Sequence, residues 1–125
     1  MVCNLTKDDI LIATARRARE IKKRLEKLAE EDAKAFSRVM EAYRISKDDP
    51  KRNDLIKKAL KYAIEVPLEV KKFAEELIKL AEHAGKVGNK NAHSDAKTAV
   101  HMAHAASRAA MENVKINKES LKKLI

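Results

Sequence analysis

The most reactive candidate in this sequence is Asp32, a carboxylate that interrupts an apolar helical stripe. Counting four residues on from Leu28 reaches Asp32, and three or four more reach Ala35 and Phe36, which is the spacing of one helix face. A carboxylate that faces a protein core has to be paired, hydrogen-bonded or protonated. We therefore expect Asp32 to point inward, at least partly buried, either as a group that moves protons or as the structural partner of a cation or a helix N-terminus.

A second group of polar side chains lies together in residues 89–95. This segment holds Asn89, Asn91, His93, Ser94 and Asp95, and it precedes an Ala-rich helix that Ser94 or Asp95 is expected to cap. Free backbone N–H groups and the dipole at a helix N-terminus favour anions, so the segment is either a ligand-binding loop or an ordinary capped turn. As a binding loop, it should stand at the mouth of a pocket whose opposite wall carries Asp32, within one chain or across a dimer contact.

Metal chemistry and nucleophilic chemistry find little support in the sequence. His101 and His104 are one helical turn apart, but no third ligand stands at a standard spacing, so we expect no metal site. Cys3 is the only cysteine, which excludes an intrachain disulfide and a thiolate zinc cage. The sequence also lacks a Gly-rich phosphate loop and a nucleophile elbow.

The composition indicates that helices position these candidate residues. The chain has 125 residues, of which 45% are apolar, 38% charged and only 3% aromatic, with two glycines and two prolines. That is the size of one domain, and the shortage of aromatic residues and glycine excludes most sandwiches and barrels. We expect a single all-α domain over residues 1–125, built as a bundle of long antiparallel helices.

Capping residues and helix breakers predict three long helices and a short last segment. The first helix begins after Thr6 and exceeds about 30 residues, since no Gly or Pro precedes Pro50. The second runs from about residue 53 to the glycines at 85 and 88, with a kink or a restart near residue 66 that Pro67 causes. The third follows the cap at 94–95 and ends where residues 113–117 break the apolar period. Helices of this size bury little apolar surface alone, and the Ala-rich third one suits a close neighbour, so we expect a homodimer or a larger homo-oligomer.

The charge and hydropathy of the chain indicate whether it binds nucleic acid or a membrane. The formal net charge of +9 comes from 28 basic and 19 acidic residues, which could attract an anionic partner. Basic residues are densest over 16–27, where glutamates are interleaved at helical spacing and no aromatic residue could stack on a base. We expect a solvated helix face or an anion-attracting surface, and no nucleic-acid partner. No stretch approaches the roughly 20 apolar residues of a membrane span and no targeting peptide is visible, so we expect no membrane partner and a cytoplasmic location.

Several sequence blocks, taken together, resemble the cyclodeaminase/cyclohydrolase family of tetrahydrofolate enzymes in order and spacing. They are EDAKAF at 31–36, VMEAY at 39–43, VPL at 66–68, GNKN at 88–91, SD at 94–95, NV at 113–114 and IN at 116–117, and the opening MVCNLT resembles the end of the family's first helix. The resemblance covers nearly the whole chain and implies an all-α, cyclodeaminase-like fold that dimerises. This chain begins after the family's Pro-Gly-Gly-Gly-Ser segment and stops about one helix early. It is therefore expected to be a short relative or part of a longer product, and whether it acts alone depends on what the Gly-rich segment does.

The resemblance also implies a chemistry. The family hydrolyses 5,10-methenyltetrahydrofolate or forms it from 5-formiminotetrahydrofolate with loss of ammonia, and both reactions take place at one cationic carbon of the folate. Such a carbon needs a fixed carboxylate and a proton shuttle, and no cofactor besides the folate itself. We assign Asp32 and Asp95 as the catalytic pair. One stabilises the cation and the other moves protons, and either residue could take either role.

The same resemblance implies which residues bind the folate. The amide and hydroxyl side chains of Asn89, Asn91, Ser94, Asn113 and Asn117 are expected to hold the pterin and the aminobenzoyl amide. The basic surface is expected to attract the glutamate tail, which is long in a polyglutamylated folate. A non-catalytic folate-binding or interaction module of the same family is the second interpretation, and a basic helical nucleic-acid binder is the third.

Overall fold

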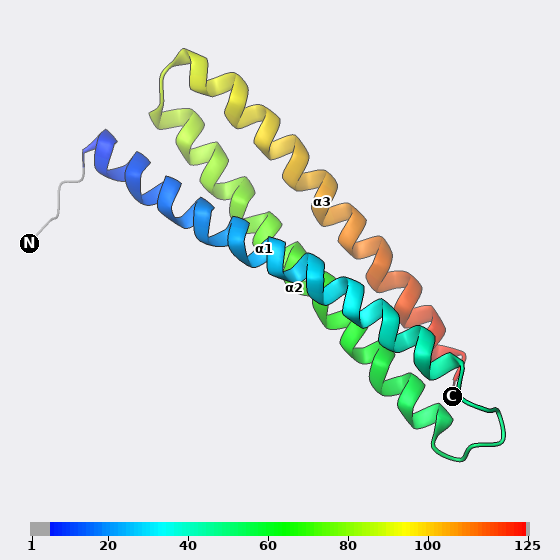
Figure 1. Ribbon diagram of the computed structural model, residues 1–125. Coiled ribbons are helices and arrows are strands. Elements are labelled where there is room, and N and C mark those ends of the chain that lie inside the picture. The colour runs from blue at the N-terminus through cyan, green and yellow to red at the C-terminus, as the bar shows by residue number, and fades with distance from the viewer. Residues whose placement is uncertain (1–5, 125) are drawn as a thin grey trace, which may run out of the picture.

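The computed structural model describes residues 6–124, apart from the side chain of Asn91. Over this range the chain forms three long helices, α1 (Lys7–Tyr43), α2 (Arg52–Val87) and α3 (Lys90–Lys122). The helices run antiparallel, with the start of α1 at the same end as the turn from α2 to α3 (Figure 1). The expected all-α fold of long antiparallel helices is confirmed. In the part of the chain that the structure describes, no helix is long and apolar enough to cross a membrane.

The first helix begins where its capping residues predict. Thr6 accepts a hydrogen bond from the backbone N–H of Asp9 at 3.1 Å, and the Asp9 carboxylate accepts one from the backbone N–H of Thr6 at 3.2 Å. This capping box satisfies two of the free N–H groups at the helix start. Asp8 and Asp9 also lie in the first turn, where negative charge is favourable.

The second helix continues through its proline. Pro67 lies buried in the interior of α2, so of the predicted kink or restart near residue 66 the restart is wrong, and the kink stays a prediction. Proline has no N–H to donate to the carbonyl four residues earlier, which belongs to Ala63. The side-chain amide of Asn117 donates to that carbonyl at 3.2 Å. A contact from α3 therefore compensates the bond that proline removes from α2.

The third helix begins one turn earlier than predicted and has no break. Its N-cap is Asn89, whose side chain accepts from the backbone N–H of Ala92 at 3.0 Å, so Ser94 and Asp95 lie inside the helix. The helix then runs without interruption through residues 113–117, and the predicted fourth segment is wrong. Gly88 ends α2 as expected, whereas Gly85 lies inside α2. A Cβ at Gly85 would stand 3.0 Å from the Cβ of Ala96, so glycine permits the close approach of α2 and α3.

The three helices form a layer with α2 in the middle. α2 packs against both neighbours, whereas no Cα atom of α1 comes within 8 Å of a Cα atom of α3 in the described residues. α1 therefore buries a narrow stripe of residues seven apart. They are Ile21, Leu28, Ala35 and Ala42. Two clusters of the core join this stripe to α2, one around Ala63 and Val66 and the other around Ile56 and Leu60.

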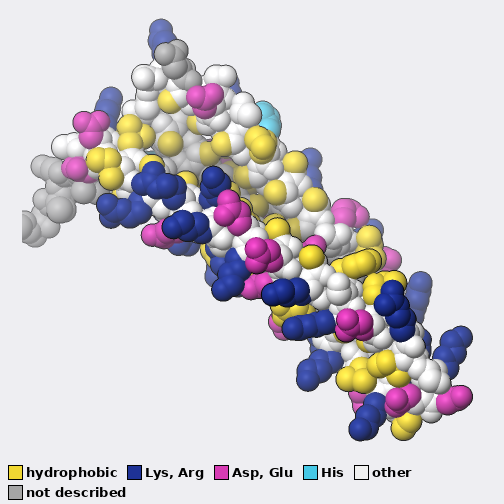
Figure 2. All heavy atoms as spheres, viewed as in Figure 1, with side chains coloured by type: hydrophobic (Ala, Val, Ile, Leu, Met, Phe, Trp, Pro, Cys, Tyr) yellow, Lys and Arg dark blue, Asp and Glu magenta, His cyan; other side chains and the backbone are white. Residues whose placement is uncertain are grey.

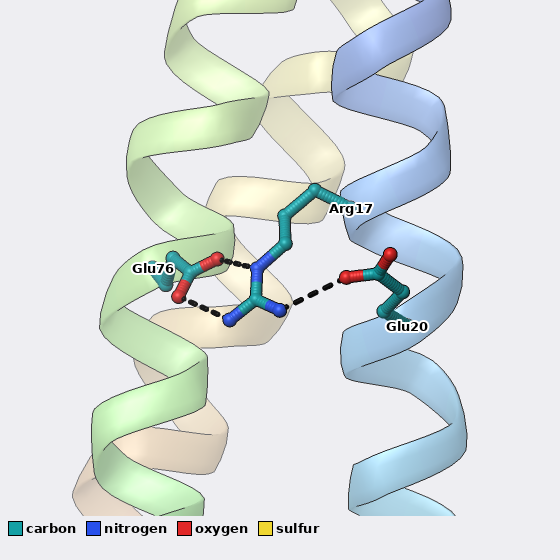
Figure 3. A network of polar contacts seen from close by, with 3 residues as sticks. All are labelled: Arg17, Glu20 and Glu76. Carbon is teal, nitrogen blue, oxygen red and sulfur yellow. Dashed lines mark hydrogen bonds and ion pairs between the residues drawn. The ribbon is translucent and has the colours of Figure 1, made fainter.

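Ion pairs reinforce the contact between α1 and α2. Arg17 makes a two-pronged contact with Glu76 and a further bond of 3.0 Å to Glu20 (Figure 3). The hydrogen bonds that Arg17 donates lower the pKa of Glu76, and because the carboxylates of Glu76 and Glu20 accept them, they also raise the pKa of Arg17. Arg24 donates to Glu69 at 2.7 Å. Part of the basic run is thus neutralised, and Figure 2 shows acidic and basic side chains interspersed along α1.

Candidate functional site

Asp32 is exposed in the structure, so the prediction that it points inward is wrong for the single chain. The reason is the narrow buried stripe: α1 packs against α2 alone, and a helix with one neighbour buries little beyond positions seven apart. Phe36, on the same side one turn later, is 66% exposed. Among the described residues Asp32 has no side-chain hydrogen bond or ion pair.

The surroundings of Asp32 are nevertheless apolar. Phe36 and Met40 follow it at one-turn intervals and are 66% and 40% exposed. Ala33, one turn before Phe36, and Ala29, one turn before Ala33, are exposed on the same side of the helix. The carboxylate therefore lies within an apolar surface that α2 leaves uncovered.

Two of the predicted amide residues lie at the level of Asp32. Leu28 and Ala35 flank Asp32 along α1 and share a core cluster with Ala63 of α2. Asn117 bonds the carbonyl of Ala63, so it belongs to the same level of the layer. The side-chain N–H₂ group of Asn117 therefore already has a partner within the protein. Asn113, one turn earlier on α3, is exposed and keeps its amide available for a ligand.

The other predicted residues gather at the opposite end, near the start of α1. Asp95 is exposed at the rim of a groove of about 430 Å³ that all three helices line, among them Thr14 and Ala18 of α1 and Ala99 of α3. The groove is mostly apolar, since alanine and leucine supply most of its wall. Asp95 could therefore act on a bound molecule as a carboxylate at an apolar rim.

The two carboxylates do not converge within one chain. Among the α1 residues that line the groove of Asp95, Ala18 is the nearest to Asp32 along the helix, and it lies fourteen residues away, or about 21 Å at 1.5 Å per residue. The prediction of a pocket shared by Asp32 and Asp95 is therefore wrong for one subunit. That Asp32 and Asp95 meet across a dimer contact stays a prediction.

The remaining residues of the 89–95 segment have mixed outcomes. The side-chain oxygen of Asn89 caps the helix. Its side-chain N–H₂ group is not used by the cap and can still donate. Ser94 is exposed with its hydroxyl available, while its backbone carbonyl accepts from Thr98 at 3.1 Å. The side chain of Asn91 lies outside the described residues. The helix N-terminus itself stands before Lys90, so the expectation that its start follows Ser94 is corrected.

Sequence reasoning overlooked one further candidate. Arg38 lies over the ring of Tyr62 at 4.9 Å from its centre, and both line a groove of about 500 Å³ between α1 and α2. A half-buried aromatic ring beside a cation could flank a planar ligand. The available signal was the rarity of aromatic residues, because Tyr62 is one of only four.

These features define an all-α protein whose carboxylates and amides lie on the open faces of a three-helix layer. The family model described as formiminotransferase-cyclodeaminase matches residues 1–123, and the chain belongs to this family. The resemblance read from the sequence is thereby confirmed. The chain is also 36% identical over 133 aligned positions to a methenyltetrahydrofolate cyclohydrolase from Methylorubrum extorquens. The alignment covers 97% of this chain and 64% of that relative, so the chain spans less than two thirds of the relative's length.

Proposed function

We propose that this chain acts in one-carbon folate metabolism and hydrolyses 5,10-methenyltetrahydrofolate, with the cyclising deamination of 5-formiminotetrahydrofolate as the alternative reaction. The observation that carries the proposal is the family match over residues 1–123 together with the similarity to a cyclohydrolase. Of the two reactions, hydrolysis is favoured because that relative is named for it.

The carboxylate at the centre of the proposal is Asp32. In hydrolysis, water adds to a cationic carbon, and an acid or base moves a proton between the water and a folate nitrogen. A carboxylate stabilises such a cation far better in a water-excluded site than in bulk solvent. Asp32 has the required apolar neighbours, but it is exposed in the single chain. The site therefore needs a cover.

We infer that a second copy of the chain supplies this cover. Large apolar side chains are exposed on both outer helices, among them Phe36 at 66% on α1 and Met102 at 70% and Ile116 at 57% on α3. Exposed apolar surface of this kind marks an interface. A two-fold axis perpendicular to the helices, midway between the levels of Asp32 and Asp95, would bring each Asp32 close to Asp95 of the partner subunit. The catalytic pair would then form twice per dimer.

The residues assigned to the substrate fall into two groups, those whose side chains are exposed and those whose side chains already bond within the protein. Asn113 and Ser94 are exposed and available to donate and accept hydrogen bonds, and we propose that they bind the pterin and the aminobenzoyl amide. Asn89 and Asn117 already serve as a helix cap and as a partner of the α2 backbone, so their contribution to binding is indirect. Asn91 remains a proposal from the sequence. The exposed basic residues of α1 would attract a glutamate tail.

A non-catalytic folate-binding module is the second candidate function. The structural roles of Asn89 and Asn117 favour it, because they remove two of the five polar side chains assigned to the substrate. Mixing the purified chain with 5,10-methenyltetrahydrofolate and following its absorbance separates the two candidates. Loss of absorbance above the uncatalysed rate supports hydrolysis. Saturable binding without turnover supports the module, and release of ammonia from 5-formiminotetrahydrofolate supports the alternative reaction.

A further inference from the structure

A second groove lies at the same end of the molecule as the turn from α2 to α3. It holds about 610 Å³ and is lined by α2 and α3 alone, in contrast to the groove of Asp95, to which α1 contributes. Its volume falls within the range of small-molecule sites. None of the polar side chains at its rim belongs to the residues assigned above to the folate. We refer to it as the lysine–histidine groove.

The rim of the lysine–histidine groove carries an excess of positive charge. Lys86 on α2 and Lys97 on α3 both line it, and Glu82 is the only carboxylate among the described residues of its lining. Among the described residues, no ion pair uses any of these three side chains. His93 and His101 stand one turn before and one turn after Lys97 on the same face of α3, and both line the groove. Each imidazole can donate a hydrogen bond, so the rim is suited to a carboxylate.

The floor of the groove is apolar and built mostly from small residues. Gly85 has no side chain, and a Cβ in its place would already stand 3.0 Å from the Cβ of Ala96. Ala96 and the half-buried Val100 continue this surface along α3. A floor of glycine and small aliphatic residues leaves room for a ring to make apolar contact with it.

We propose that the lysine–histidine groove binds an aromatic carboxylate, with the ring on the floor and the carboxylate groups paired with Lys86 and Lys97. The charge excess favours an anion, and the apolar floor of small side chains accommodates a ring. Two sources share this chemistry. One is the aminobenzoyl-glutamate half of a folate, and the other is an unrelated aromatic acid.

The test uses isophthalate, a planar dicarboxylate, and the histidines of the chain as local reporters. The sequence has four histidines, and only His93 and His101 line the groove. In a titration followed by NMR, the ring signals of His93 and His101 should shift saturably while those of His83 and His104 stay in place. Uniform shifts of all four signals, or no shifts, would overturn the proposal.

Two controls separate charge from ring contact. The double variant Lys86→Gln/Lys97→Gln should bind isophthalate about tenfold more weakly or worse, because both charge-assisted contacts are lost. The matched variant Lys115→Gln/Lys118→Gln removes the same charge elsewhere on α3 and should change binding less than about twofold. The neutral analogue isophthalamide should bind poorly to the unmodified chain. Equal weakening by both variants, or equal binding of the amide, would count against the site.

The source of the ligand is then decided by competition. Displacement of isophthalate by 4-aminobenzoylglutamate at about tenfold lower concentration would connect the groove to the folate. Displacement at equal or higher concentration would assign the groove to another aromatic acid. Folate turnover is not measured in this test, so the result stands apart from the outcome for the proposed reaction.

Discussion

Asn117 donates its side-chain amide to the backbone carbonyl of Ala63 at 3.2 Å. Ala63 stands four residues before Pro67, at the carbonyl that a proline leaves without a helical partner. The pair explains how α2 stays continuous where the sequence predicted a kink or a restart. It also gives Asn117 a structural task that the sequence alone did not suggest.

Replacing Asn117 by Ala should destabilise the fold by about 1–3 kcal/mol, because the carbonyl of buried Ala63 loses its partner. The measurement is urea unfolding at a fixed protein concentration. The loss should shrink in a Pro67→Ala background, since residue 67 then supplies its own N–H to that carbonyl. An equal loss in both backgrounds would show that Asn117 acts in some other way, so the double-mutant cycle decides the point.

The Arg17–Glu76 contact should make stability depend on pH in the acid range. Arg17 lowers the pKa of Glu76 below its ordinary value of 4.5. A lowered folded-state pKa adds stability above the unfolded value, and this contribution is lost as the pH falls through the folded one. Thermal unfolding between pH 3 and 7 should therefore show a smaller acid decline for Glu76→Gln than for the unmodified chain. Glu26→Gln, at an exposed glutamate for which we find no partner among the described residues, should leave the decline unchanged.

Light scattering should give the mass of a dimer, twice the 14.1 kDa of one chain. Phe36→Asp should return it to the monomer, because Phe36 is 66% exposed and would lose only contacts with a second copy. Circular dichroism should show that the variant keeps its helices. Lys34→Asp, also an exposed position of α1, is the matched control and should remain dimeric. A monomeric unmodified chain at micromolar concentration would contradict the interface.

Cysteine cross-linking tests whether Asp32 meets Asp95 of the partner subunit. In a Cys3→Ser background, chains that carry Asp32→Cys mixed with chains that carry Asp95→Cys should form a disulfide-linked heterodimer on mild oxidation. A disulfide requires Cα atoms within about 7 Å, whereas at least about 21 Å of α1 lies between Asp32 and the groove of Asp95 within one chain. Glu30→Cys in place of Asp32→Cys should cross-link far less, since Glu30 points elsewhere on α1. Absence of the heterodimer would separate the two carboxylates and end their assignment as a pair.

Local chemistry made part of this structure predictable. Thr6 and Asp9 fixed the start of α1, because a capping box depends only on residues three apart. Asn89 and Ser94 are both good caps, and the choice between them depended on where α2 ended. The exposure of Phe36 depended on how many helices cover α1, which a helical period does not encode. The separation of Asp32 and Asp95 likewise depends on which helices pack together, so the site was predicted by residue type but not by geometry.

Asp32→Asn should separate a catalytic role of Asp32 from a structural one. Since Asp32 is exposed on the single chain and has no partner among its described residues, the change should alter the free energy of unfolding of the monomer by less than about 0.5 kcal/mol. Turnover of 5,10-methenyltetrahydrofolate should nevertheless fall by about 10²-fold or more, because an amide neither carries the charge that stabilises the cationic carbon nor moves the proton. The decisive measurement is both quantities on the same preparation, with Glu30→Gln as the matched exposed control. Loss of stability in proportion to activity would instead make Asp32 a structural residue of the subunit contact.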